Sequence, residues 1–551
     1  MIVPKSVFAH YMVGLTLNQT TDQWKRDIRS ASAASIDGFA LNIGAADHFT
    51  FSSLHTAYEA ASTFANFSLF LSFDFSASGP DDGWTVDYIA NLTNSFKDEP
   101  AQFKIDGKPL VSTFEGVDFR ESWREVRKKV AGDIVFVPDW SSVGPEGVRE
   151  RVGDIDGAFS FDAWPRPSQS QLTTFSDDGY LSALSSSSSS SSTSPNSKTT
   201  TTTSQNNNNN NNNKIYMMGI SPYFYTRLSS YQKNWYSPSD TLWPTRLSQA
   251  LSLNHANMDS GSGGGGGSPD LLQIITWNDF AESHYISDLV PSQILSEAES
   301  YVNGFDHGGF RAVLPWYVAA YKLGKTSAEE GLIDREWPEE KLGDGVVSAW
   351  YRTTPVNVTT TTINGKEECG DGGTKWGQQG ERSAMEAVER DVVNVLAIVR
   401  RDTQVVVSVE STGKKVVKQV RKKGGASFFQ VGFEELGLGK GNKKGGKVRI
   451  EMNGEVREGR EIRDECPGSG VINFNAATVY IAKSTHPDSG NDDGGSGSSG
   501  SAGSGSGSGS GSKDGKGDGD EDGAENAAMP GRSVGVTAAL VASLGFALFN
   551  L

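Results

Sequence analysis

The 551-residue chain has few cysteines and no excess of basic residues. The two cysteines, Cys369 and Cys466, have no second cysteine or histidine at metal-ligand spacing, so we expect no zinc site. They can form one disulfide if the chain is secreted, and are otherwise free thiols. The net charge of −17 argues against nucleic-acid binding, which needs a basic footprint. It suits a neutral substrate or an acidic extracellular setting.

The two ends of the chain carry opposite targeting signals. No long apolar segment precedes the first strand-like run, so no signal peptide is visible. The C-terminus has small residues at Asn526–Ala528, a short spacer and an apolar run over 534–551, which is the layout of a glycolipid-anchor signal. A membrane-spanning helix is the alternative, but the run is short for a bilayer and no basic stop follows. Because anchoring requires secretion, we expect an extracellular protein at the cell wall or surface, with a leader ahead of Met1.

The first 335 residues alternate between strand-like and helix-like runs. Eight apolar runs predict strands: Val7–Val13, Gly38–Ile43, Ser68–Phe75, Pro109–Phe114, Ile134–Trp140, Ala158–Trp164, Tyr216–Tyr225 and Leu271–Asn278. Helical spacing follows most of them: Asp22–Ala33, Ser53–Phe64, Trp84–Phe96, Phe119–Val130, Asp240–Leu253 and His307–Leu323. Eight repeats in this length predict an α/β fold, a closed (β/α)8 TIM barrel over residues 1–335. A doubly wound open sheet is the rival, but no G-x-G-x-x-G follows the first strand.

Two low-complexity inserts interrupt the barrel, at 185–213 and 260–268. Their Ser, Asn and Gly composition cannot bury enough apolar surface to become ordered. Both lie between a helix and the next strand, which in a barrel is the end away from the functional site. We therefore expect tolerated insertions rather than functional loops.

The chain changes character at about Trp337. Short alternating runs with Gly-rich turns predict an antiparallel β-sandwich over 336–485. The runs are Val346–Trp350, Asn394–Val399, Gln404–Glu410, Lys415–Val420, Ser427–Val431, Lys447–Met452 and Ala477–Ile481. Residues 486–525 are rich in Gly, Ser and Asp and predict a flexible linker. The remaining 526–551 form the anchor signal.

Acids and aromatic residues gather where the predicted strands end, which is the functional face of a barrel. The candidates, in chain order, are His10, Tyr11, Asn42, Asp74, Glu115, Asp139, Trp140, Asp162, Trp164, Tyr223, Tyr225, Trp277, Asn278, Asp279 and Glu282. Carboxylates interleaved with Trp and Tyr are typical of a carbohydrate site, because aromatic faces stack on sugar rings and carboxylates bind hydroxyl groups.

Glycoside cleavage needs one acid that protonates the leaving oxygen and a second carboxylate. Asp279 and Glu282 are the best pair, and Asp74 is a third acid that could hold the network or tune a pKa. The spacing leaves their separation open, because residues three apart are close on a helical turn but ~10 Å apart in extended chain. Which carboxylate is the acid also stays open.

Several candidates have a purely structural alternative. Asp139 could cap a helix, and Glu115 could bind only a neighbouring amide. Trp164 could be part of the core, and His10 could be a buried, hydrogen-bonded histidine. Metal hydrolysis is disfavoured because only His10 is well placed among the histidines, and no serine nucleophile elbow is present. We expect no cofactor and no metal.

Six motifs, in this order, resemble glycoside hydrolase family 71, the fungal α-1,3-glucanases or mutanases: Phe8–Gly14, Ile36–Asn42, Phe73–Phe75, Phe136–Trp140, Ile220–Tyr225 and Trp277–Ser283. The resemblance spans about residues 6–485. It implies a (β/α)8 barrel with a C-terminal β-sandwich, no metal, and inverting endo-hydrolysis of α-1,3-glucan in fungal cell walls. The catalytic acids that it implies are Asp74, Asp279 and Glu282.

The sequence therefore predicts a monomeric, secreted or wall-anchored endo-α-1,3-glucanase. The rival from another class is a non-catalytic wall-glucan binding or structural protein on the same scaffold. Such a protein would keep the aromatic residues and lose an acid, whereas all three acids are present here. Hydrolysis of another α-glucan linkage is a further alternative that residue types do not exclude.

Overall fold

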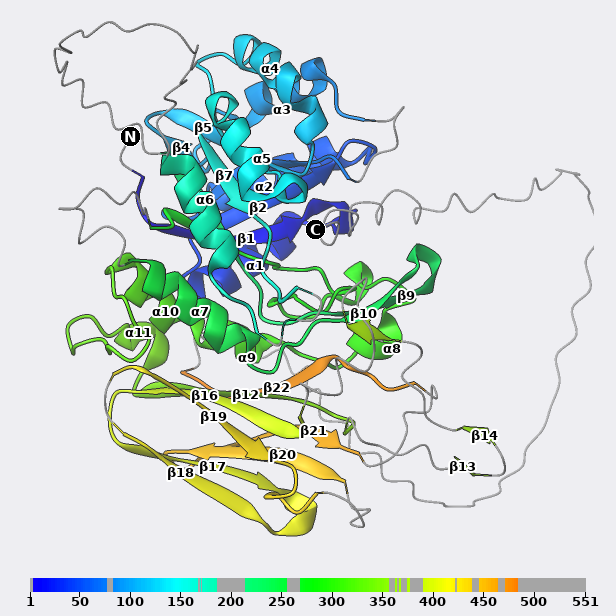
Figure 1. The fold of residues 1–551 in the computed structure, drawn as a ribbon, viewed down its shortest axis with the longest axis vertical. Coiled ribbons are helices and arrows are strands. Elements are labelled where there is room, and N and C mark those ends of the chain that lie inside the picture. The colour runs from blue at the N-terminus through cyan, green and yellow to red at the C-terminus, as the bar shows by residue number, and fades with distance from the viewer. Residues whose placement is uncertain are drawn as a thin grey trace, which may run out of the picture. The chain divides into compact units, whose positions relative to one another are not determined.

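Eight parallel strands close into a barrel (Figure 1), in the order β3-β2-β1-β11-β8-β7-β6-β5, with β3 pairing β5. The computed structural model describes residues 3–76, 83–166, 169, 171–185, 214–254, 268–355, 362–363, 366–367, 374–376, 390–421, 424–438, 445–463 and 471–483. The barrel strands are β1 (Ser6–Met12), β2 (Gly38–Gly44), β3 (Ser68–Asp74), β5 (Lys108–Phe114), β6 (Val135–Asp139), β7 (Gly157–Ser160), β8 (Ile215–Ile220) and β11 (Leu271–Ile274). The prediction of a closed (β/α)8 barrel is confirmed.

Alternate residues of each barrel strand face opposite sides, and both sides are apolar. Phe8, Ala40 and Phe70 belong to the cluster that fills the barrel. Their neighbours, such as Ala9 and Phe39, belong to the cluster between the barrel and its helices. The strands read as continuous apolar runs because both of their faces are covered. The same period of two decides which strand-end side chains face the barrel mouth.

Helices cover the outside of the barrel (Figure 1). The main ones are α1 (Thr21–Ala33), α2 (Thr50–Ala61), α3 (Val86–Phe96), α4 (Trp123–Lys129), α5 (Gly144–Glu150), α6 (Phe175–Ser185), α7 (Leu242–Ser252) and α10 (Leu314–Lys322). The predicted helix at 307–323 is split into α9 (Gly308–Ala312) and α10. Short helices α8 (Glu299–Val302) and α11 (Glu339–Leu342) complete the set of named α-helices. We did not predict α5 and α6. The buried side of α6 includes Ser176 and Asp177, which interrupts the apolar period.

Three barrel strands end earlier than the sequence predicts. β7 stops before Asp162, β8 stops before Tyr223, and β11 stops before Trp277. After β8 the chain forms a hairpin of β9 (Tyr225–Leu228) and β10 (Lys233–Tyr236). The short β15 (Lys375–Trp376) pairs with β10. The residues beyond β7, β8 and β11 therefore lie in loops at the C-terminal end of the barrel.

The later part of the chain forms two antiparallel four-stranded sheets, as predicted. Their orders are β19-β16-β12-β22 and β18-β17-β20-β21, and valine-rich inner faces form one core between them. The strands are β12 (Gly345–Arg352), β16 (Val392–Val399), β17 (Thr403–Val409), β18 (Lys415–Val420), β19 (Ala426–Gly432), β20 (Gly446–Met452), β21 (Glu455–Ile462) and β22 (Ala476–Ile481). We did not predict β21, because arginine and glutamate occupy most of its positions.

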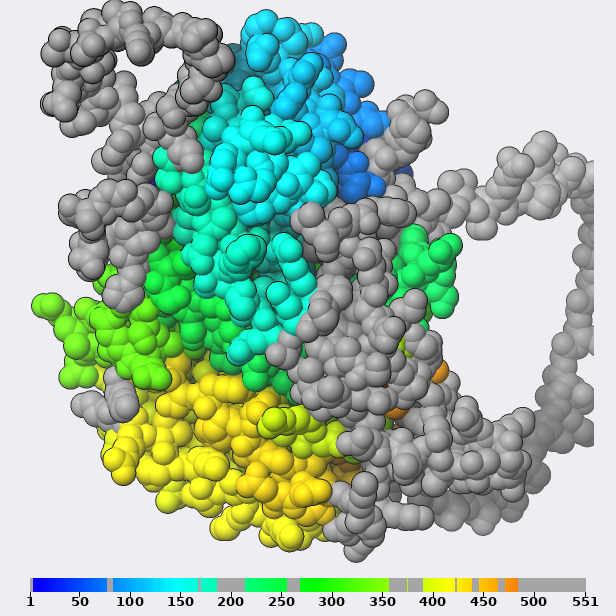
Figure 2. Space-filling view, in the orientation of Figure 1, coloured from blue at the N-terminus to red at the C-terminus, as the bar shows by residue number. Residues whose placement is uncertain are grey.

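The sandwich meets the barrel at α9, which lies beside β12 and β22 (Figure 1), and the two surfaces touch in the space-filling view (Figure 2). Ser348 Oγ donates to Gly309 O at 2.8 Å, and Gly309 N–H donates to Thr478 Oγ1 at 3.1 Å. A Cβ on Gly309 would lie 2.8 Å from Ser348 Oγ, so glycine permits this close approach.

Several predicted segments lie wholly or almost wholly outside the described residues. They are the inserts, both cysteines, the linker and the anchor signal. The described chain on either side of the inserts is α6 followed by β8, and α7 followed by β11, so each insert joins a helix to the next strand. No helix within the described ranges is long and apolar enough to cross a bilayer.

A buried ion pair ties α6 to α7 behind β8. Arg246 Nη1 lies 2.6 Å from Asp177 Oδ2, and Arg246 Nη2 lies 2.9 Å from Asp177 Oδ1. Tyr216 of β8 donates its hydroxyl to Asp177 Oδ1 at 2.6 Å, and Arg246 Nε donates to Gly219 O at 2.9 Å. Both charged side chains are almost wholly buried. The pair therefore fixes two helices against one barrel strand.

We expect Asp177→Asn to lower the free energy of unfolding by about 3–5 kcal/mol, because it leaves the Arg246 charge buried without a counterion. Urea unfolding measures the loss. The matched control is Asp178→Asn on the exposed side of the same helix, for which we expect a change within about 0.5 kcal/mol. Equal stability of the two variants would contradict a structural role for the pair.

Candidate active site

Asp279 and Glu282 lie together on a tight loop that follows β11. Asp279 N–H donates to Thr276 Oγ1 at 2.9 Å, and Glu282 N–H donates to Asp279 Oδ1 at 3.1 Å. The loop is therefore a turn rather than extended chain, which settles the separation that the sequence left open. Both side chains are buried, with relative exposures of 1% and 2%.

Two basic side chains complete this group. His284 Nε2 lies 3.1 Å from Glu282 Oε2 and 3.7 Å from Asp279 Oδ2. Lys233 Nζ of β10 lies 3.0 Å from the other Glu282 oxygen, Oε1. We call Lys233, Asp279, Glu282 and His284 the acid cluster. We did not predict a role for Lys233 or His284.

The surroundings move the two pKa values apart. Burial raises the pKa of Asp279 to about 6, and the charge of Glu282 adds to the rise, against the opposing charges of His284 and Lys233. Burial also opposes ionisation of Glu282, but Lys233 and His284 outweigh it and hold the pKa of Glu282 below its usual range. The cluster thus favours a proton on Asp279 and a charge on Glu282. Carboxyl groups with separated pKa values are how acid and base roles are assigned in one site.

Asp74, the third predicted acid, ends β3 at the same end of the barrel. Asn42 Nδ2 of β2 donates to Asp74 Oδ2 at 3.1 Å. The amide and hydroxyl of Ser76 donate to Asp74 Oδ1 at 2.9 and 2.8 Å. These bonds fix the orientation of the carboxylate, which is 1% exposed. Asp74 shares the parity of the inward-facing Phe70, so it points toward the barrel axis.

Asp74 and the acid cluster follow different strands at the same end of the barrel. In the strand order β3-β2-β1-β11, Asp74 is three strand spacings from the loop after β11. Three spacings make an arc of ~14 Å, and the direct distance across a barrel is shorter. Asp74 and the acid cluster therefore belong to the same end of the barrel, with β2 and β1 between them in the strand order.

His10 lies on β1, between β3 and β11 in the strand order, and points inward. Its Nδ1 lies 2.8 Å from Gln273 Nε2, and its ring packs edge-on against Phe161 at 5.5 Å. Burial lowers the pKa of His10 to about 3, and the neighbouring His284 adds to the effect. The imidazole is therefore neutral and hydrogen-bonded, as the structural alternative for this residue predicts.

Asp139 and Glu115 form a second buried acid pair. Asp139 Oδ1 accepts the amides of Ser141 at 3.1 Å and Phe161 at 3.4 Å, and Glu115 Oε1 accepts the amide of Ser142 at 2.9 Å. Burial raises the pKa of both acids, and the charge of Glu115 adds to the rise at Asp139. Glu115 thus binds a neighbouring amide, as its structural alternative predicts, whereas the N-cap of the next 3-10 helix is Trp140 and not Asp139. Asp139 nevertheless faces the barrel interior.

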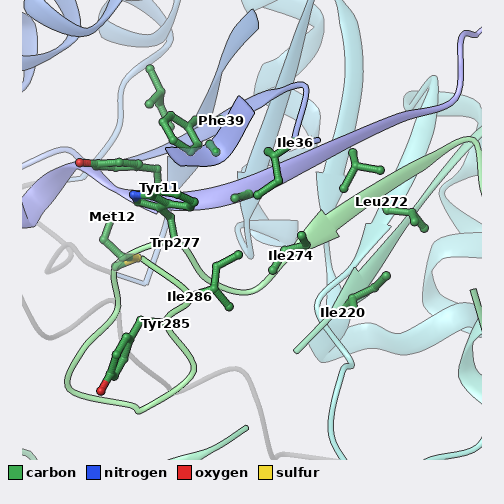
Figure 3. Close-up of a cluster of buried hydrophobic side chains, with 14 of the residues drawn as sticks. Tyr11, Met12, Ile36, Phe39, Ile220, Leu272, Ile274, Trp277, Tyr285 and Ile286 are labelled. Carbon is green, nitrogen blue, oxygen red and sulfur yellow. The ribbon is translucent and has the colours of Figure 1, made fainter. Parts of the chain in front are cut away.

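Three aromatic candidates point away from the mouth. Tyr11 donates its hydroxyl to Asp27 Oδ2 of α1 at 2.7 Å and stacks on Trp24 at 4.5 Å. Trp277 packs against Phe39, and Figure 3 shows Tyr11, Phe39 and Trp277 in one buried cluster. Trp140 belongs to the same cluster between barrel and helices. All three side chains thus lie between the barrel and its helices, which argues against the prediction that they bind substrate.

The remaining candidates support the site from behind or beside it. Trp164 is buried, and its ring lies 5.6 Å from that of His284. Tyr223 donates its hydroxyl to Phe474 O at 2.6 Å, and the Tyr225 ring packs against Tyr301. Asn278 bridges the main chain of β1, because its side chain bonds both Met12 N–H and Met12 O. Asp162 is partly exposed and lies 3.7 Å from Arg166.

Asp279, Glu282 and His284 place one potential ligand atom each within 4.8 Å of one another. Lys233 Nζ already donates to Glu282 Oε1, so a divalent cation bound by Glu282 would lie close to a positively charged ammonium group. The donor set fits a hydrogen-bonded acid pair better than a metal centre.

Comparison with known proteins shows what this geometry belongs to. Residues 3–491 match the family model described as Glycosyl hydrolase family 71. The chain is 33% identical to a glucan endo-1,3-alpha-glucosidase of Schizosaccharomyces pombe, over 65% of this chain and 72% of that protein. It is 31% identical to a mutanase of Penicillium rubens, over 65% and 67%. An ascus wall endo-1,3-alpha-glucanase of Schizosaccharomyces pombe is 28% identical over 65% and 74%.

The raised pKa of Asp279 predicts that the free energy of unfolding depends on pH. The folded pKa of about 6 exceeds the unfolded value near 3.9, so the folded state binds the proton more tightly. The resulting stabilisation is fully present below pH ~4 and is lost as the pH rises through ~6, by up to about 3 kcal/mol. The stability difference between wild type and Asp279→Asn should therefore shrink by that amount between pH 4 and pH 7. Urea unfolding at both pH values measures it, and a constant difference would contradict the raised pKa.

Proposed function

The chain belongs to glycosyl hydrolase family 71, and we propose that it is an endo-acting glycoside hydrolase that cleaves α-1,3-glucan, the polysaccharide of fungal cell walls. The observation that carries the proposal is the acid cluster within a family match over residues 3–491. The names of the relatives supply the linkage. The polar groups of the mouth suit a neutral sugar, and nothing in the composition favours nucleic acid.

We propose that Asp279 is the general acid. Its carboxyl keeps a proton up to a pH of about 6, because burial, together with the charge of Glu282, raises its pKa. A protonated carboxyl can pass its proton to the glycosidic oxygen as the bond to the anomeric carbon breaks. Glu282 then stabilises the proton on its neighbour and the positive charge that develops on the sugar. This assigns the role that the sequence left open.

The second carboxylate of an inverting reaction is then Asp74 rather than Glu282. Inverting enzymes hold the acid and the base roughly 6.5–9.5 Å apart, with the sugar and a water between them. Asp279 and Glu282 place ligand atoms within 4.8 Å of each other, which is too close for that arrangement. Asp74 stands three strands away from the loop after β11 at the same end of the barrel, and Asn42 and Ser76 orient its carboxylate. We therefore propose that Asp74 activates the attacking water.

Sugar release from insoluble α-1,3-glucan tests the activity. We expect Asp279→Asn, Glu282→Gln and Asp74→Asn each to lose at least about 100-fold in rate, the usual contribution of a general acid or base. The matched control is Glu299→Gln on the exposed face of α8, which should keep wild-type activity. Full activity in the Asp279 and Glu282 variants would reject the proposal.

The stereochemistry of the first product separates the two assignments of the second carboxylate. Proton NMR just after mixing should show the new reducing end in the β configuration, because water attacks from the face opposite the α-linked leaving group. An α product would instead indicate that a carboxylate attacks the ring. Binding to the glucan without sugar release by the wild type would favour the non-catalytic alternative.

We propose an extracellular location with attachment through a glycolipid at the C-terminus. The support is the sequence over 526–551 and the wall-associated name of one relative. Phosphatidylinositol-specific phospholipase C should release the full-length protein from intact membranes, whereas high salt should not. A protein that stays on the membrane after the lipase treatment would contradict the anchor.

A further inference from the structure

A lysine enters the acid cluster from outside the barrel. Lys233 begins β10, the second strand of the hairpin that follows β8. Its side chain is 9% exposed, and its ammonium lies 3.0 Å from Glu282 Oε1. Lysine is rarely buried to this extent unless it is paired with an acid. A residue held here, against one carboxyl of the catalytic pair, is placed to act on that pair.

The hairpin holds Lys233 in a fixed position. β10 pairs with β9 on one side and with β15 on the other. Thr374 Oγ1 donates to Asn234 Oδ1 at 3.0 Å next to the lysine. On the first strand of the hairpin, Tyr225 N–H donates to Glu282 O at 3.1 Å. The same hairpin thus contacts Glu282 through both its main chain and its side chain.

The ammonium group contacts only one of the two acids. The groups that face Glu282 are Lys233 from β10, and Asp279 and His284 from the loop after β11, with His10 of β1 behind His284. Lys233 bonds Glu282 directly and reaches Asp279 only through space. Two adjacent buried carboxyls hold one proton more readily than none, so an asymmetric cation decides which of them holds it.

We propose that Lys233 is a positioning residue that keeps Glu282 ionised and so assigns the single proton of the pair to Asp279. This rests on the proposed function, since it explains why Asp279 rather than Glu282 acts as the acid. Without the ammonium of Lys233, Glu282 is buried without its counterion. The shared proton then moves from Asp279 to Glu282. Asp279 then has no proton to give to the leaving oxygen.

The pH profile of hydrolysis tests this. On soluble α-1,3-gluco-oligosaccharides, Lys233→Met should lower kcat about 100-fold with KM changed less than about 3-fold. The acidic limb of its pH profile should move up by about one pH unit or more, because the pair keeps a second proton to higher pH. Lys233→Arg, which keeps the charge, should retain the wild-type limb. The control is Lys214→Met. In the wild type, the half-buried ammonium of Lys214 donates to Ile155 O at the other end of the barrel, so we expect this variant to keep the wild-type limb.

A stability measurement keeps the test independent of substrate. Lys233→Met leaves a charge buried, so its melting temperature should fall further below wild type at pH 8 than at pH 5. The double variant Lys233→Met/Glu282→Gln should recover most of that loss. The inference would be overturned by an active wild type whose Lys233→Met variant has the wild-type acidic limb and the same melting difference from wild type at pH 5 and pH 8. Wild type without glucanase activity would overturn the proposed function, while the melting series would still decide the role of Lys233.

Discussion

The burial of two carboxyl groups on one short loop is the constraint on which the site depends. Asp279 and Glu282 are held close together in a turn, because the Asp279 amide donates to Thr276 Oγ1 and the Glu282 amide donates to Asp279 Oδ1. Water reaches neither side chain freely, so the pair cannot carry two uncompensated charges. Lys233 and His284 balance one charge, and the other acid keeps a proton. The chemistry of proton donation thus follows from exclusion of water rather than from residue type alone.

The loop that carries the pair is braced by residues that come later in the chain. Tyr301 donates its hydroxyl to Ala281 O at 2.6 Å, and its main-chain oxygen accepts the side chains of Asn473 and Asn475. His307 stacks on Tyr285 at 4.0 Å. The segment before β22 therefore supports the catalytic loop directly. The segment before β22 and the loop after β11 are thus joined through one tyrosine.

The sequence predicted the barrel well because its strands are long apolar runs that packing on both faces requires. Among its strand-end candidates, His10, Asn42 and Asp74 share the parity of the inward-facing residues, whereas Tyr11 and Trp140 pack toward the helices. The strand period contains the missing signal. Tyr11 alternates with His10, and Trp140 alternates with Asp139, so one of each pair must face the helices. If site residues are chosen only because they end a strand, and the side that each side chain faces is ignored, too many residues are assigned to the site.

Other features had no signal in a single sequence. β21 alternates arginine and glutamate because much of it faces solvent, which obscures the apolar period. Lys233 lies in a hairpin whose place is fixed by pairing with β15, about 140 residues later in the chain, and such long-range pairing leaves no local pattern. The residue that completes the acid cluster therefore becomes visible only when the fold brings β10 to the loop after β11.

The two acid pairs of the barrel mouth show how much a single cation decides. Asp139 and Glu115 are buried like Asp279 and Glu282, and their hydrogen-bond donors are the neutral groups of Ser141, Ser142 and Phe161. In the described part of the chain no basic side chain bonds either acid, and the pKa of both is raised. Beside Lys233, in contrast, one acid of the pair has a lowered pKa. Equal burial thus gives two protonation-prone acids in one pair and a separated acid and carboxylate in the other, and only the separated pair can donate a proton while keeping a charge beside it.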